Sequence, residues 1–492
     1  MKLSRSDFRN YLPWLLFFSF VIFTTTRDAV LLFRHPFAVG VNGYYYVLQV
    51  NQLAETGHLY FPTRTPLALY TLMAVARIVG NSITTIKALG ILLQILLSIG
   101  IFGVVRNATS NSWVALLGLG LTIIPQSRLY LTTEYINQLF GLVLLIWAGL
   151  TFMRAFRTRG LVRWLIPFGL VVGAYVSHKS AQVFVPTIVI CLLLMFALTG
   201  SAVWKSLGFA ALTILWFSPA IVSAQPFVGI PEWLQNQITY RPHWPIDPAV
   251  IPEELMLVTA AVGVLFLVLW QSKKGKGPDL FILAFGGLSL FSLLVTLNPF
   301  FNVQTIMSAV AGRSRLLSYV QVACLVPALI WLVYSRKREA AIYVGAAFLP
   351  LVVLSALAPL PLGLRPEFLV RREQLIESLR NHAKELAQDS IIIAPHGDQF
   401  VVTAITGIPA QQQPPTSSRY SNEYWLLNTV SDQSFGTEGI VLNRSHDSTI
   451  MLLDDEILQR KLLELGRSET LLLLSANPHL AGTLPQGGLK RK

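Results

Sequence analysis

Charged residues are scarce in this sequence, and their scarcity excludes an ordinary soluble domain. Only 13% of the 492 residues are Asp, Glu, Lys or Arg, whereas soluble domains usually hold about a quarter. More than half of the residues, 53%, are hydrophobic, and the mean hydropathy is +0.56. Apolar runs of about twenty residues, each long enough to cross a bilayer as a helix, recur from Tyr11 to Gly363. The sequence therefore predicts an α-helical polytopic membrane protein.

Cysteine and the common catalytic motifs are also nearly absent. The two cysteines, Cys191 and Cys324, fall inside apolar runs, which predicts small core residues instead of a disulfide or a metal pair. The sequence holds no HExxH, no CxxC, no glycine-rich phosphate loop and no serine nucleophile elbow. No small-residue cleavage site follows the first apolar run, so we expect a retained membrane anchor.

The net charge of +13 does not indicate a nucleic-acid partner. The basic residues form short clusters between apolar runs instead of a stripe on one soluble face, and such clusters mark the cytoplasmic side of a membrane protein. They predict an integral membrane protein with a cytoplasmic N-terminus. The compact loops favour a bacterial plasma (inner) membrane, with a eukaryotic ER membrane as the alternative. We expect about eleven spans, at roughly 11–25, 82–105, 112–126, 135–153, 164–177, 181–199, 206–224, 255–271, 280–297, 315–334 and 341–362.

The C-terminal residues differ in kind from the rest of the chain. After a charged helical stretch, the sequence DSIIIAPHGDQFVVTAITG shows the βα alternation of a small α/β unit. The sequence thus predicts two domains: a transmembrane domain over 1–363 with a first outer loop at 26–66, and an extracytoplasmic α/β domain over 364–492.

The long polar segment from Thr24 to Pro66 holds the first candidate for catalysis. Loops of this length are usually functional, and Asp28 opens this one where the first span is expected to leave the membrane. A carboxylate there can take the proton of an attacking hydroxyl. The alternative is that Arg27 and Asp28 form an interfacial anchor pair.

Further candidates lie at the predicted outer ends of other spans. Glu134 and Arg128, in the turn between the third and fourth spans, would point into the same cavity as Asp28, although Glu134 also fits a solvated turn acid. His178 and Lys179 suit a phosphate or pyrophosphate headgroup, with interfacial snorkelling as the alternative.

Candidate substrate contacts follow from two other patterns. Basic residues on the outer side run against the usual bias, so Arg313 and Arg315 at the start of the tenth span indicate an anion partner. Asn42 suits a turn or helix cap before Tyr44 and Tyr45. The helix that they begin also fits an interfacial amphipathic helix with aromatic anchoring.

Together these features resemble the GT-C class of membrane glycosyltransferases, which includes protein O-mannosyltransferases, the aminoarabinose transferase of lipid A and oligosaccharyltransferases. The resemblance covers about residues 10–335 in architecture. Locally it is carried by Asp28, by VNGYYYVLQV through ETGHLYFPTRTPLALYTLMA, and by GNSITTIKALGILLQILL. It implies a sugar donor on a polyprenyl phosphate or pyrophosphate, and a lipid, glycan or protein acceptor on the outer face. The mechanism that it implies is inverting displacement with Asp28 as base.

The acids of the first loop differ from the family pattern. Asn42 stands where many members have an acid, and only Asp28 and Glu55 are acidic in the loop. Hard cations usually take several oxygen ligands, so no cofactor is assigned and a divalent metal has weak support. The alternative function is a non-enzymatic polytopic protein, such as a transporter or flippase of lipid-linked glycans, or a catalytically degenerate relative.

Overall fold

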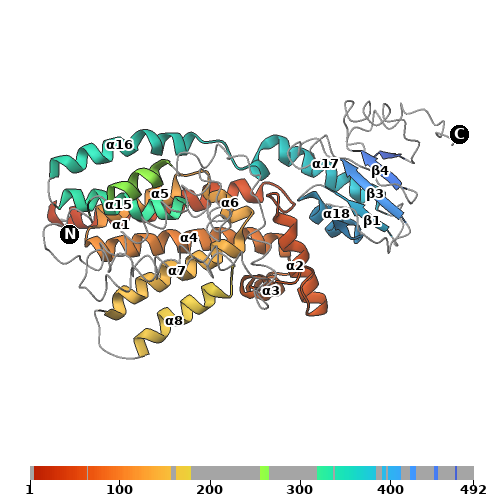
Figure 1. Cartoon of the computed structure of the whole chain (residues 1–492), viewed down its shortest axis with the longest axis horizontal. Coiled ribbons are helices and arrows are strands. Elements are labelled where there is room, and N and C mark those ends of the chain that lie inside the picture. Colours follow the sequence, from red (N-terminus) through yellow and green to blue (C-terminus); the bar gives the residue numbers. More distant parts are fainter. Residues whose placement is uncertain are drawn as a thin grey trace, which may run out of the picture. The chain divides into compact units, whose positions relative to one another are not determined.

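The protein is mostly helical, with one small sheet near its C-terminus (Figure 1). Its computed structural model describes residues 5–63, 65–156, 162–178, 255–264, 267, 318–335, 338–383, 390–394, 397–411, 422–427, 448–452 and 471–473. The chain divides into two compact units. The first comprises Met1–Leu31, Thr63–Ala68 and Ala88–Pro361, and the second comprises Leu32–Pro62, Leu69–Lys87 and Leu362–Lys492.

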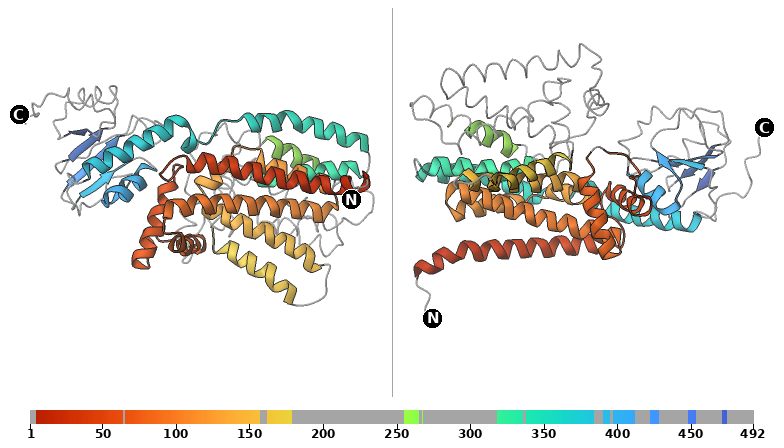
Figure 2. Two further views of the ribbon diagram at one scale, coloured as in Figure 1. Left: turned by 180° about the vertical axis from the view of Figure 1, so that it is seen from behind. Right: turned by 90° about the horizontal axis from the view of Figure 1, so that it is seen from below.

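The first unit is a set of apolar helices, some of which pack side by side, as α7 and α8 do (Figure 2). They are α1 (Arg5–Phe33), α4 (Ser82–Thr109), α5 (Ser112–Ile123), α6 (Arg128–Thr133), α7 (Ile136–Phe156), α8 (Val162–Tyr175), Leu255–Val264, α15 (Ser318–Tyr334) and α16 (Arg338–Leu357). The last residues of α1 and the first of α4 belong to the second unit.

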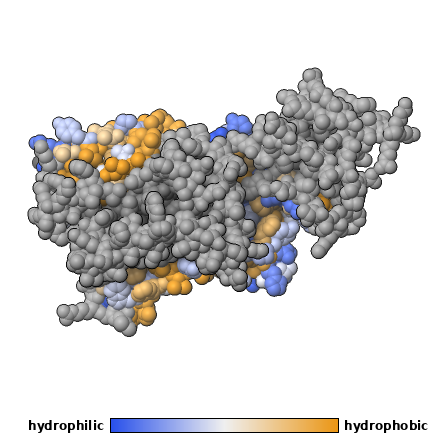
Figure 3. Space-filling model, viewed as in Figure 1, coloured by the Kyte–Doolittle hydropathy of each residue, from blue (hydrophilic) through white to orange (hydrophobic). Residues whose placement is uncertain are grey.

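Among the described residues, four helical segments are long and apolar enough to cross a membrane: Tyr11–Phe33, Ser82–Thr109, Ile136–Ala155 and Arg338–Leu357. Large apolar side chains such as Ile342 and Tyr343 are exposed on α16 (Figure 3), where lipid would cover them. These helices indicate a multi-pass membrane protein. The predicted sixth, seventh and ninth spans lie outside the described residues, so the number of spans and their orientation stay predictions.

The predicted end of the first span at residue 25 is wrong, because α1 continues to Phe33. The polar residues that suggested a loop are accommodated within the helix. Thr24 Oγ1 donates to the carbonyl of Phe20 at 2.8 Å, and Thr25 Oγ1 donates to that of Val21 at 2.7 Å. Threonine hydroxyls commonly bond back to the preceding turn in this way. The connector between α1 and α2 is therefore residues 34–42, and the predicted first outer loop at 26–66 begins eight residues too early.

Close helix contacts in the first unit occur at glycines. A Cβ at Gly118 on α5 would lie 2.9 Å from the carbonyl oxygen of Ala323 on α15. Pro327 stands four residues after Ala323 and has no N–H to offer that carbonyl. Small residues let membrane helices approach closely. Cys324, the next residue of α15, is buried as predicted, whereas Cys191 lies outside the described residues.

The second unit joins α2 (Gly43–Thr56) and most of α3 (Leu67–Val79) to the C-terminal α/β fold. That fold comprises a 3-10 turn (Leu362–Leu364), α17 (Pro366–His382), β1 (Ser390–Ile393), α18 (Asp398–Thr406), β2 (Ala410–Gln411), β3 (Asn422–Leu427), β4 (Ser448–Leu452) and β5 (Leu471–Leu473). The strands form a parallel sheet in the order β2-β1-β3-β4-β5, with Ile392 opposite both Ala410 and Tyr424. The predicted strand and helix at SIII and DQFVVTAIT are confirmed as β1 and α18.

We predict that Gly118→Ala destabilises the protein, because the new methyl group meets a backbone oxygen that no side-chain rotation can move. The expected cost is about 1–3 kcal/mol, seen as a lower thermal midpoint in detergent. Gly149→Ala is the matched control, because a Cβ there would have no neighbour within 4 Å in the part of the chain that the structure describes. It should leave the midpoint unchanged or raise it slightly, because alanine favours a helix over glycine by up to about 1 kcal/mol. Equal midpoints for the two variants would contradict the close contact.

Candidate functional site

A buried ion pair links α1 to α6 in the first unit. Arg128 Nη1 donates to Asp28 Oδ2 and Arg128 Nη2 donates to Asp28 Oδ1, each at 2.5 Å. Asp28 is 2% exposed and Arg128 is 1% exposed. The two parallel bonds form the bidentate fork that makes arginine suited to carboxylates. The sequence placed Asp28 and Arg128 in one cavity, and the structure brings them together directly.

Neighbouring groups add a second, weaker ion pair to this carboxylate. Arg27 Nε lies 3.5 Å from Asp28 Oδ1, and its side chain is partly exposed. Arg27 thus makes the pair that we considered as an anchor, but the buried partner of Asp28 is Arg128. In the described part of the chain, Arg128 Nε and Ser127 Oγ are buried without a hydrogen-bond partner. Buried polar groups without partners are rare, so this end of α6 retains unused hydrogen-bonding capacity.

A small gap with a mixed polar and apolar lining lies beside the ion pair. Its lining includes Thr24, Thr25 and Asp28 from α1, together with Gln94 and Ser98 from α4. The gap offers about 10 Å³ for the centre of a water molecule, which is about what one ordered water needs. A sugar therefore does not fit beside Asp28 unless the surrounding helices move apart.

Glu134 and His178 occupy separate positions from the ion pair. Glu134 is buried and ends the six-residue helix α6. Because Arg128 begins that helix, the backbone atoms of Arg128 and Glu134 are about 9 Å apart along the helix axis. Burial contradicts the alternative of a solvated turn acid. His178 follows α8 and is half-buried, with its Cβ 3.7 Å from the place that a Cβ at Gly141 of α7 would take.

The predicted contacts Asn42, Tyr44 and Tyr45 belong to the second unit. Asn42 is the N-cap of α2, as predicted, but its side chain makes no capping hydrogen bond. Tyr44 is 2% exposed, and the Tyr45 hydroxyl accepts a hydrogen bond from Gln49 Nε2 at 3.0 Å. Burial raises the pKa of both phenols.

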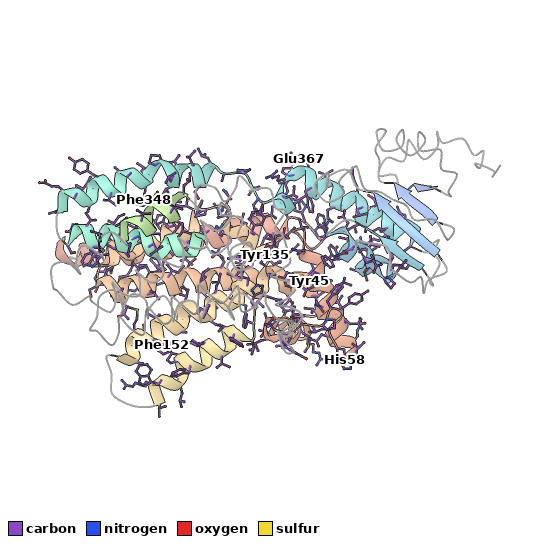
Figure 4. The ribbon with its side chains drawn as sticks, in the orientation of Figure 1. Tyr45, His58, Tyr135, Phe152, Phe348 and Glu367 are labelled. Carbon is purple, nitrogen blue, oxygen red and sulfur yellow. The ribbon has the colours of Figure 1, made fainter. Side chains whose placement is uncertain are left out.

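Tyr45 takes part in an aromatic cluster with Phe61 and Phe400. Tyr45 is labelled on α2 in Figure 4. Its ring stacks on that of Phe61 at 5.8 Å and meets the ring of Phe400 edge-on at 5.5 Å. Such pairs stabilise packing beyond the area that they bury. The buried face of α2 thus packs against α18 of the same unit instead of serving as a face for lipid.

The sequence analysis missed Lys87, a buried lysine in the second turn of α4. Lys87 is 4% exposed; its Nζ donates to the carbonyl of His35 at 2.5 Å and lies 5.7 Å from the centre of the Phe33 ring. No carboxylate of the described residues forms an ion pair with it. An ionisable residue inside a membrane-spanning segment indicates function. The isolated Lys in SITTIKALGILLQ was the signal that could have identified it.

The surroundings of Lys87 carry positive charge. The backbone carbonyl of His35 accepts the hydrogen bond from Lys87. The pKa of the His35 imidazole is lowered first by burial and then by the charge of Arg34. Lys87 lowers it further, while Glu373 acts in the opposite direction. Two cations and one carboxylate thus act on the His35 imidazole.

The remaining candidates, Lys179, Arg313 and Arg315, lie outside the described residues. Within the described ranges, no three His, Cys, Asp or Glu side chains gather as a metal site would require. The structure thus brings Asp28 and Arg128 together in the first unit, and it places Asn42, Tyr44 and Tyr45 in the second unit with Lys87.

No family profile matches the chain. No curated protein sequence matches it either. Among solved structures, the chain is similar to the crystal structure of the Archaeoglobus fulgidus oligosaccharyltransferase in complex with zinc and sulfate, at 12% identity and a TM-score of 0.47. The match covers 80% of this chain and 62% of that chain. A likeness at this level transfers neither activity nor ligands.

We predict that Asp28 and Arg128 depend on each other for stability. Breaking a buried ion pair by removing one partner costs about 3–5 kcal/mol, because the other charge stays buried without compensation. Asp28→Asn and Arg128→Gln should each lower the thermal midpoint in detergent, and the double variant should lose less than the sum of the two. Arg27→Gln is the control and should change the midpoint little, because Arg27 is partly exposed. Additive losses would show that the two side chains do not interact.

Proposed function

We propose that the protein is a membrane glycosyltransferase. It takes a sugar from a polyprenyl-phosphate-linked donor and passes it to a lipid, glycan or protein acceptor at the outer face of the membrane. The proposal extends the resemblance to the GT-C class that the sequence carries. It includes an inner-membrane location with the N-terminus in the cytoplasm and the α/β domain outside.

Lys87 is the observation that carries this proposal. A buried ammonium needs a counter-charge, and the described residues provide Lys87 with a carbonyl and an aromatic face only. Lys87 stands near the start of a helix long enough to cross the bilayer. The phosphate of a lipid-linked sugar is an anion that a membrane presents at the depth of its headgroups, and lysine is a common phosphate ligand. We assign Lys87 to the donor phosphate.

Asp28 is the proposed base. In the transfer, a hydroxyl oxygen of the acceptor bonds to the anomeric carbon while its proton passes to an Asp28 oxygen. The bond from that carbon to the phosphate oxygen breaks, and the phosphate leaves with the electron pair, which inverts the anomeric centre. Both Asp28 oxygens accept hydrogen bonds from Arg128. The reaction therefore requires Arg128 to release one of them when the substrates bind.

Other residues keep supporting roles within the proposal. Glu134 is a buried carboxylate at the end of α6, the helix that Arg128 begins, and we propose that it assists Asp28. His178, Lys179, Arg313 and Arg315 are proposed contacts of the phosphate or pyrophosphate. Asn42, Tyr44 and Tyr45 are proposed contacts of the sugar or acceptor, and a divalent metal is not required by the residues that we assign.

A non-enzymatic role is the second candidate, and the geometry of the ion pair favours it. Arg128 engages both oxygens of Asp28, and the adjacent gap has room for about one water. A pair of this kind also fits a purely structural link between α1 and α6. In that case the protein would bind or move a lipid-linked glycan, or would be a relative that has lost activity.

The test is turnover by the purified protein. Wild type, Lys87→Met, Lys87→Arg and Asp28→Asn are incubated with a panel of radiolabelled polyprenyl-phosphate sugars, and loss of label from the lipid is followed. A lost charge-assisted hydrogen bond predicts that Lys87→Met slows transfer by about ten- to a hundredfold. Lys87→Arg should retain part of the activity, and Asp28→Asn should retain little.

Arg163→Gln is the charge-matched control, because Arg163 is an exposed cation on α8. It should turn over donor like wild type. Full activity of Lys87→Met would discard the phosphate assignment, and full activity of Asp28→Asn would discard the base while keeping the enzyme class. Donor binding by wild type without transfer would favour the non-enzymatic role.

A further inference from the structure

The strand order of the C-terminal sheet creates a defined ligand-binding position. In the order β2-β1-β3-β4-β5, the chain passes from β1 to a neighbour on one side and then returns to β3 on the other. This reversal makes a topological switch point between β1 and β3. Open parallel sheets bind their ligands in the crevice at the carboxyl ends of the strands at such a point.

A segment of the same chain lies at this position. Gly397, which follows β1 and is the N-cap of α18, has a φ of +90°. A Cβ there would lie 2.5 Å from Val41 Cγ1 and 2.9 Å from the Val41 carbonyl oxygen. Val41 belongs to the connector between α1 and α2. Its backbone therefore occupies the space directly against the start of α18, where close approach requires glycine.

Further contacts hold the connector in the second unit. The Gly40 N–H donates to the carbonyl of Gly363, just before α17, at 3.2 Å. Residues 37–40 are buried, although loops usually run over the surface. Immediately after the connector, the Tyr45 ring on α2 contacts Phe400 on α18. The connector is thus held by backbone and side-chain contacts on both sides of Val41.

The start of α18 also forms an ion pair with α17. Arg372 Nη2 on α17 lies 3.3 Å from Asp398 Oδ1, and both side chains are buried. Arg372 also lies 4.8 Å from the ring centre of Phe368. An ion pair removed from water holds its partners in place. This ion pair links α17 to the first residue of α18, next to Gly397.

We propose that the C-terminal α/β domain is a receptor for the chain's own α1–α2 connector, which it binds at the switch point in place of a small ligand. The domain thereby determines the conformation of the connector that follows α1 directly. This inference does not depend on the glycosyltransferase proposal, because it rests on the contacts of Gly397, Gly363 and Phe400 alone.

Hydrogen exchange of the full-length protein in detergent tests the proposal, with Gly397→Ala as the perturbation. The new methyl group should displace Val41 and accelerate exchange across 37–46 by at least about tenfold, because the Gly40 amide loses its acceptor. Gly407→Ala is the matched control. Gly407 also has a positive φ, +74°, and lies at the other end of α18, but a Cβ there would have no neighbour among the described residues within 4 Å.

Two further variants separate displacement of the connector from general damage to the domain. Val41→Ala removes the methyl group nearest to Gly397, so Val41→Ala with Gly397→Ala should regain part of the protection. Tyr45→Leu leaves Gly397 intact, removes the ring that contacts Phe400, and should also accelerate exchange across 37–46. The proposal is overturned if the wild-type segment already exchanges like an unfolded peptide. It is equally overturned if Gly397→Ala and Gly407→Ala affect that segment alike.

Discussion

The arrangement of α1 and α6 depends on one bidentate ion pair, because an unpaired carboxylate among apolar helices would cost several kcal/mol in lost hydration. Arg128 compensates Asp28 across 100 positions of sequence. It thereby lets α1 remain a helix past its polar TTTRD segment and ties a six-residue helix to the first one. The same bonds restrain chemistry, since both oxygens that a base would use are already acceptors.

Lys87 differs from Asp28 in the partners that surround its charge. The membrane domain satisfies Asp28 internally, whereas Lys87 receives from the described residues a carbonyl and an aromatic ring without a negative charge. A buried charge with a structural role is usually paired with an opposite charge. A buried charge without a described partner is a candidate ligand-binding residue. The ion pair links two helices, and Lys87 is the residue to which our proposal assigns the donor phosphate.

Glycines mark both places where backbones meet most closely. Gly118 lets α5 reach the Ala323 carbonyl in the first unit, and Gly397 lets the connector reach α18 in the second. In the first case the small side chain serves helix packing. In the second, the positive φ and the contact together require glycine. The first outer segment and the C-terminal domain consequently form one compact unit, although more than 270 residues separate them.

The sequence suggested a shared cavity for Asp28 and Arg128, but only the structure shows their ion pair. Composition and periodicity by themselves determined the membrane class, the helices of the described spans and the α/β character of the tail. These features follow from local hydropathy and strand or helix period, which each segment carries alone. Only the tertiary structure decided where α1 ends, that the segment after it joins the C-terminal unit, and that Lys87 has no described counter-ion. Each of these depends on a partner distant in sequence, and local patterns contain no information about such partners.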